Sequence, residues 1–150
     1  RSGSSIAAEV ATMTMAEEMD ALRTMGVNPI RYVLVPKMYA LTLTQPLLTM
    51  MANIVGIFGG LLVALFYLDI SIPAFWNQLL SAVTMKDLLT GLFKSVVFAA
   101  LIGLVSAHVG FRTTGGAAGV GRSTTRSVVA SIFLVIVADA VFSLIFYFGD

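Results

Sequence analysis

Positions 38–68 form a stretch of 31 residues, between Lys37 and Asp69, in which no side chain is charged. An α-helix needs about 20 apolar residues to cross the hydrocarbon core of a bilayer, so this stretch can span a membrane. Only 11% of the chain's residues are charged, whereas soluble domains carry roughly 25%. So little charge cannot cover a water-soluble globule, and the sequence predicts an integral membrane protein.

Two more apolar runs follow, and together with the first they predict three transmembrane helices, at residues 38–68, 92–111 and 127–149. Residues 70–85 carry apolar side chains at helical spacing after Pro73, which suits the first turn of a helix. They predict a short amphipathic helix at the membrane interface, with Trp76 in the aromatic belt. The expected fold class is an all-α helical bundle that forms one membrane domain over residues 1–150.

Lysine and arginine are distributed unevenly around these spans. Seven of them lie in residues 1–37 and 112–126, and only Lys86 and Lys94 lie in between. By the positive-inside rule, segment 1–37 and loop 112–126 are predicted to be cytoplasmic. The helix at 70–85 is then predicted to face outward.

Composition also excludes several functions. The chain has no cysteine and one histidine, which rules out thiol chemistry and a histidine-rich metal centre. A net charge of +1 gives no basic face for nucleic acid. We therefore expect no cofactor, no metal and no catalytic residue of its own.

The first residues lack an initiator methionine and a signal-peptide pattern, so we expect the sequence to begin inside a longer protein.

Residues 5–25 contain no Gly or Pro and stop at Gly26, which predicts one cytoplasmic helix with a glycine C-cap. At 100° per residue, Glu9, Glu17 and Asp20 share one face of that helix. This acidic face is either a solvated surface or a docking face for a partner with basic residues. Lipid contact is disfavoured, because a helix on an anionic leaflet would carry Lys and Arg.

The same region resembles the MlaE/YrbE-type permeases of ABC phospholipid transporters, and the resemblance extends over nearly the whole chain. The matching runs are GSSIAAEVATM (residues 3–13), EEMDAL (17–22), MGVNP (25–29) and Pro36-Lys37. The resemblance implies that helix 5–25 is a coupling helix seated on a separate ATPase subunit. The residues that it assigns to the ATPase contact are Glu9, Thr12, Met13, Glu17 and Asp20.

The resemblance also implies the setting of the chain. Its expected partners are the ABC ATPase, an MCE-domain lipid-binding subunit, a small STAS-type regulatory subunit, a second copy of the chain and phospholipid. The expected location is the bacterial inner membrane. An interfacial helix and two further spans precede this region in the family.

A glycine-rich run at residues 116–123 matches the spacing of a phosphate-binding loop, except that Arg122 replaces the lysine. A phosphate loop needs a strand before it and a parallel-sheet domain around it, so we reject that interpretation. We expect instead a tight glycine-rich reversal, with Ser123 and Thr124 capping the third span. The run GVGRSTTRSVV (119–129) also resembles a family motif.

Polar residues inside the spans are the remaining candidates for function. Asp139 lies near the middle of the third span, and Asn53, at the centre of the first, could donate a hydrogen bond to it. Asp139 is interpreted as a helix clamp, as part of the transport path or as a proton-coupling group. His108 lies near the cytoplasmic end of the second span and is interpreted as interfacial.

Small residues at four-residue spacing predict close packing of helices or contact with a second copy. They are Ala52, Gly56 and Gly60 in the first span and Ala99, Gly103 and Ala107 in the second. The predicted function is the permease subunit of an ABC transporter that moves phospholipids between the inner and outer membranes. The alternative is an ion- or proton-coupled secondary transporter centred on Asp139.

Overall fold

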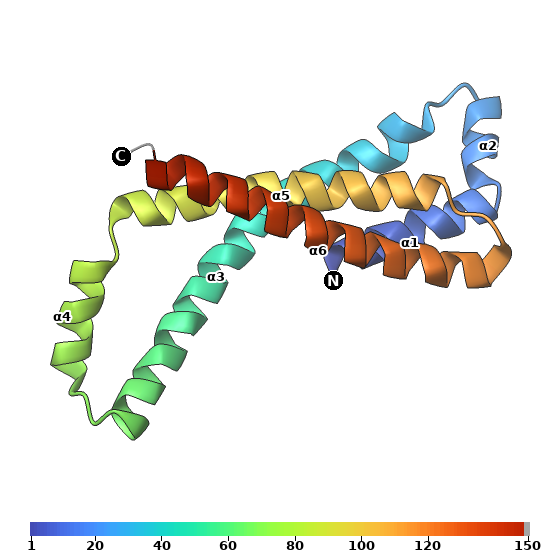
Figure 1. Ribbon diagram of the computed structural model, residues 1–150. Coiled ribbons are helices and arrows are strands. Elements are labelled where there is room, and N and C mark those ends of the chain that lie inside the picture. Colours follow the sequence, from blue (N-terminus) through green and yellow to red (C-terminus); the bar gives the residue numbers. More distant parts are fainter. Residues whose placement is uncertain (149–150) are drawn as a thin grey trace. The chain divides into compact units, whose positions relative to one another are not determined.

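A computed structural model describes residues 1–148, and in that range the chain is helical except for short connections (Figure 1). In chain order the elements are α1 (Ser2–Met15), α2 (Glu18–Thr24), the π-helical segment η1 (Ile30–Leu34), α3 (Val35–Tyr67), α4 (Ile72–Ala82), α5 (Met85–Phe111) and α6 (Gly116–Phe148). No strand occurs among these residues, so the predicted all-α class is confirmed.

Three helical stretches are long and apolar enough to cross a membrane. They are Ile30–Tyr67, which joins η1 to α3, then Met85–Phe111 and Gly116–Phe146. Each contains nearly all of one of the three predicted spans: Leu68 falls just after the first stretch, and residues 147–149 follow the third, with Gly149 outside the described residues. All three are longer than the predicted spans, because the helices continue into the polar residues that flank each apolar run and keep backbone groups paired there.

The chain divides into two compact units, one formed by Arg1–Leu43 with the chain from Val97 onward, the other by Thr44–Val96. In the first unit, α1 lies beside α6 and the end of α5 (Figure 1). In the second unit, α4 folds back toward α3, so that a Cβ placed on Gly60 would lie 3.8 Å from Phe75 Cζ.

The contact of α1 with α5 and α6 depends on side chains small enough to let the helix backbones approach. A Cβ placed on Gly110 of α5 would lie 2.8 Å from Val10 Cβ and 3.2 Å from the Ala7 carbonyl oxygen. At Gly3 of α1 it would lie 2.7 Å from Ile102 Cγ2 and 2.9 Å from Ser106 Oγ. These distances are shorter than real Cβ contacts, so a side chain at either position would force its neighbours to shift, most of all at Gly110, where they are a Cβ and a backbone oxygen.

The single helix predicted at residues 5–25 is wrong, because the structure breaks it into α1 and α2. Glu17 adopts the left-handed conformation (φ 58°) between them. The acidic face predicted for one helix is therefore interrupted at its middle residue. Spacing alone could not reveal this, since a left-handed residue at this point redirects the chain without any Gly or Pro to mark it.

The predicted glycine C-cap is confirmed at the end of α2. Gly26 has φ 75°, its N–H donates to the Arg23 carbonyl at 3.0 Å, and the Val27 N–H donates to the Leu22 carbonyl at 2.9 Å. This pair of bonds is the Schellman arrangement, which satisfies carbonyls at the helix end.

The reversal before the third span is shorter than predicted. It is confined to residues 112–115, where Gly115 has φ 91°, and α6 has already begun at Gly116. Ser123 and Thr124 therefore do not cap the helix. Thr124 Oγ1 donates to the Val120 carbonyl at 2.8 Å within it, and Ser123 Oγ accepts from Thr113 Oγ1 at 2.8 Å. The glycines at 119 and 121 are helical here, although glycine usually weakens a helix.

The short helix predicted at 70–85 is confirmed as α4, with Pro73 in its first turn. None of its residues is buried within the chain, and Trp76 is half exposed. Its position at a membrane interface stays a prediction.

The requirement for glycine at the α1–α5 contact can be tested with one methyl group. We expect Gly110→Ala to destabilise the protein by about 1–3 kcal/mol, since the added Cβ overpacks against the rigid Val10 Cβ and the Ala7 carbonyl. Gly59→Ala is the matched control, because no atom lies within 4 Å of a Cβ there. The measurement is thermal unfolding of the purified protein in detergent, and equal effects at both sites would contradict this packing.

Candidate functional site

Buried hydroxyl groups link α5 and the reversal after it to α6. Ser127 Oγ of α6 donates to Ser106 Oγ of α5 at 2.9 Å, and Ser106 Oγ donates to the Ile102 carbonyl at 2.6 Å. Nearer the reversal, Thr113 Oγ1 donates to Ser123 Oγ at 2.8 Å. Hydrogen bonds between hydroxyl groups help helices to associate in membranes. Apolar side chains are already solvated by lipid there, so their burial does not drive association.

These contacts show how far α1 extends along the spans. Gly3 lies against Ile102, Ser106 and Ser131, and Ser131 is 15 residues into α6, which corresponds to about 22 Å of helix. The start of α1 therefore lies beside the middle of helix α6 and the second half of α5. Within residues 5–25, α1 is packed on the bundle through buried Ala7, Val10 and Ala11, whereas α2 buries only Met19.

A small apolar core supports α2. Val10, Met19 and Val33 are buried together, and the half-buried side chains packed against them are Ile6, Met13, Leu22 and Phe111. The core thus joins α1, α2, η1 and the end of α5. A helix of seven residues is too short to be stable alone, so α2 owes its conformation to this core.

The segment after α2 re-enters the bundle through η1. Asn28 Oδ1 accepts from the Ile30 N–H at 3.0 Å and begins the helical stretch. The Val35 N–H donates to the Ile30 carbonyl, five residues back, as in a π-helix. Pro36 follows in the first turn of α3; its ring would clash with the carbonyl four residues earlier in a regular α-helix, and the wider turn avoids that clash.

The five residues predicted to contact the ATPase differ in their surroundings. Glu17 and Asp20 are exposed, and Asp20 Oδ1 lies 3.3 Å from Arg23 Nη1 on the same helix. Thr12 is exposed, and its hydroxyl donates to the Ala8 carbonyl at 2.8 Å. Met13 packs on the apolar core and is half buried. The structure thus brings Glu17 and Asp20 together at α2.

Glu9, the fifth residue, forms an ion pair with Lys37 of α3. The Lys37 side chain is only 22% exposed, whereas that of Glu9 is 57% exposed. The pair ties the first helix to the start of the first span. Sequence reasoning used Lys37 as a charge that orients the chain and as part of a family motif. It missed the ion pair, because a partner 28 positions away cannot be recognised from local spacing.

The predicted small-residue stripes lie in different environments. Ala99, Gly103 and Ala107 are buried, and Gly103 faces Met38 and Leu41 of α3. Ala52, Gly56 and Gly60 are exposed within the chain. A third stripe, Ser123, Ser127 and Ser131 on α6, was missed, although its four-residue spacing of small polar side chains was visible in the sequence.

The intramembrane polar residues Asn53 and Asp139 are both exposed within the chain. Asn53 belongs to one compact unit and Asp139 to the other, so their pairing stays a prediction. His108 is exposed in the last turn of α5. Among residues 1–148, no three His, Asp or Glu side chains gather in a group that could hold a metal ion.

Three candidate spans joined by small and hydroxyl-bearing residues define a multi-pass helical membrane protein. Residues 1–145 match the family described as Permease MlaE. The chain therefore belongs to the MlaE permease family.

Relatives from distant sources agree with this assignment. A probable ABC transporter permease of Rickettsia prowazekii is 37% identical over 98% of this chain and 57% of its own length. One from Synechocystis is also 37% identical, over 99% of this chain and 57% of its own length. The chloroplastic protein TRIGALACTOSYLDIACYLGLYCEROL 1 of Arabidopsis thaliana is 40% identical over 99% of this chain and 43% of its own length. The chain thus spans about half the length of these relatives.

The Glu9–Lys37 pair gives a direct test of the link between α1 and α3. We expect Lys37→Glu to lower stability, because it places two like charges together beside a largely covered position. The exchanged pair, Glu9→Lys with Lys37→Glu, should recover part of the loss, with a coupling free energy of about 1 kcal/mol. Thermal unfolding of the four proteins completes the cycle, and additive effects would show that the two side chains do not interact.

Proposed function

We propose that this chain is the membrane-embedded core of an ABC transporter that moves phospholipid between the inner and outer membranes of a bacterium. The family assignment supports an ABC permease. The name of the plant relative is that of a galactolipid, which is in keeping with a lipid substrate. The alternative of a secondary transporter centred on Asp139 has no support from the family.

The coupling element in this proposal is α2. The observation that carries it is that α1 is packed against the spans, whereas α2 is largely exposed. Helix α1 is held beside the spans by buried small residues. Helix α2 is exposed on one side, with Glu17 at its N-cap and Glu18 and Asp20 in its first turn, and packs on the bundle core through Met19. A partner that pushes on α2 would therefore act on α1, η1 and α5 together.

The partners in this proposal follow from the same assignment. A separate ATPase subunit binds α2 and supplies the hydrolysis that this chain does not perform. A lipid-binding MCE-domain subunit lies on the outer side, and a small STAS-type subunit has a regulatory role. A second copy of the chain completes the path, and the exposed stripe Ala52, Gly56 and Gly60 suits such a contact.

The coupling role of α2 can be tested by charge reversal. We expect Glu17→Lys with Asp20→Lys to reduce co-purification of the ATPase at least tenfold, because like charges brought together in an interface cost several kcal/mol. Lipid-stimulated ATP hydrolysis by the assembled complex should fall with it. The control is Asp69→Lys, a single acid-to-lysine reversal beyond the far end of α3. Unchanged binding and hydrolysis in the double variant would remove α2 from the interface.

The orientation on which this proposal depends can be tested separately. The chain has no cysteine, so single cysteines at exposed Gln78 of α4 and Thr24 of α2 report cleanly. In intact cells we expect an impermeant maleimide to label Gln78→Cys, and to label Thr24→Cys only after permeabilisation, as the positive-inside rule requires. Labelling of Thr24→Cys in sealed cells would reverse the topology.

A further inference from the structure

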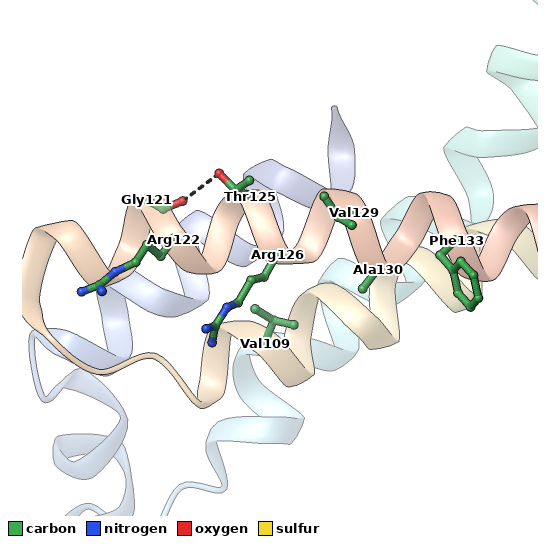
Figure 2. A pocket seen from close by; sticks show the side chains of 8 residues that line it. All are labelled: Val109, Gly121, Arg122, Thr125, Arg126, Val129, Ala130 and Phe133. Carbon is green, nitrogen blue, oxygen red and sulfur yellow. Dashed lines mark hydrogen bonds between the residues drawn. The ribbon is translucent and has the colours of Figure 1, made fainter.

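A groove of about 770 Å³ lies along the first half of α6 where it faces the end of α5. Arg122 and Arg126 form one end of it, and Val129, Phe133 and Val109 form its apolar wall. Figure 2 shows the two arginines extending from α6 one turn apart, with Val109 of α5 beside Arg126. All of these residues belong to one compact unit.

The charge of this groove is one-sided. No acidic side chain lines it, and within residues 1–148 neither guanidinium pairs with a carboxylate. Like charges one helical turn apart repel each other, so an anion between them would relieve the repulsion. Arginine forks also match the oxygens of a phosphate group.

The position of the groove selects the kind of anion. Arg126 is the last charged residue before twelve uncharged positions of a candidate span. The apolar wall lies in that span, and Val129 and Phe133 are 63% and 67% exposed. From Arg122 to Phe133 the helix rises about 16 Å, a length that suits an acyl chain hanging below a headgroup.

We propose that this groove binds an anionic phospholipid, whose phosphate lies between Arg122 and Arg126 and whose acyl chain runs along Val129 and Phe133. The site lies at the headgroup level of the membrane, where basic residues attract anionic lipids. This lipid-site proposal requires only that the chain spans a membrane. If the lipid site is absent, the proposed transport function still stands, and unchanged transport in the variants would not contradict the lipid site.

The test uses the full-length permease in its complex, purified in detergent with equal amounts of phosphatidylglycerol and phosphatidylcholine. Native mass spectrometry measures how much of each lipid stays bound. We expect Arg122→Gln with Arg126→Gln to lower the ratio of retained phosphatidylglycerol to phosphatidylcholine roughly tenfold. Arg112→Gln is the matched control, because Arg112 is exposed at the same end of α5 but does not line the groove. We expect it to keep the wild-type ratio.

A second variant tests the apolar wall and leaves both arginines in place. Val129→Trp should fill the groove and lower retention of phosphatidylglycerol, and it decides the matter if the double arginine variant fails to assemble. An unchanged ratio in the double variant, or unchanged retention in Val129→Trp, would overturn the proposal. So would an equal loss in Arg112→Gln, which would indicate diffuse attraction to the basic surface.

Two further outcomes would name a different occupant. Displacement of the lipid by millimolar inorganic phosphate alone would show a free-phosphate site, since phosphate has no acyl chain to hold it in the groove. Loss of the ATPase from the double variant, with lipid retention unchanged, would show a protein contact. Either result overturns the lipid assignment.

Discussion

The close approach of α1 to α5 and α6 is the contact on which the rest of this unit depends. It exists because Gly3 and Gly110 leave room for neighbouring backbones and side chains, and because Ala7 and Ala11 are small enough to be fully covered. In a membrane, burial of apolar area gives little reason for helices to associate, so tight packing must supply it. One methyl group in this contact is therefore a larger change than it would be on a lipid-facing surface.

The core beneath α2 is built on that contact. Val10 lies in it and also packs against Gly110, so the same residue joins the bundle to the segment proposed to meet the ATPase. A short exposed helix without such support would fray. A displacement of that helix would then not be transmitted to the rest of the bundle. The Glu9–Lys37 pair adds a second tie, from α1 to the start of α3. Through these contacts α2 is connected to α1, η1 and α5 and, by way of α1, to the start of α3.

Several features were predictable because they depend on local or compositional signals. The three spans follow from long apolar runs with at most one charge each, α4 from its spacing after Pro73, and the end of α2 from Gly26. The break at Glu17 was not predictable, because glutamate rarely adopts a left-handed conformation and neighbouring residues favour helix. The start of α6 at Gly116 was missed for the opposite reason, since four glycines in seven positions normally indicate a turn.

By itself the sequence determined that the chain lies in a membrane, how many times it can cross, and which family it resembles. These properties depend on hydrophobic length and on motifs that can be read along the chain. Only the tertiary structure decided that Glu9 pairs with Lys37, that Met13 is part of a core, and that α1 lies beside the spans. Each of these depends on residues that are distant in sequence and meet only when helices pack, and helical spacing describes which face a residue occupies but not what that face meets.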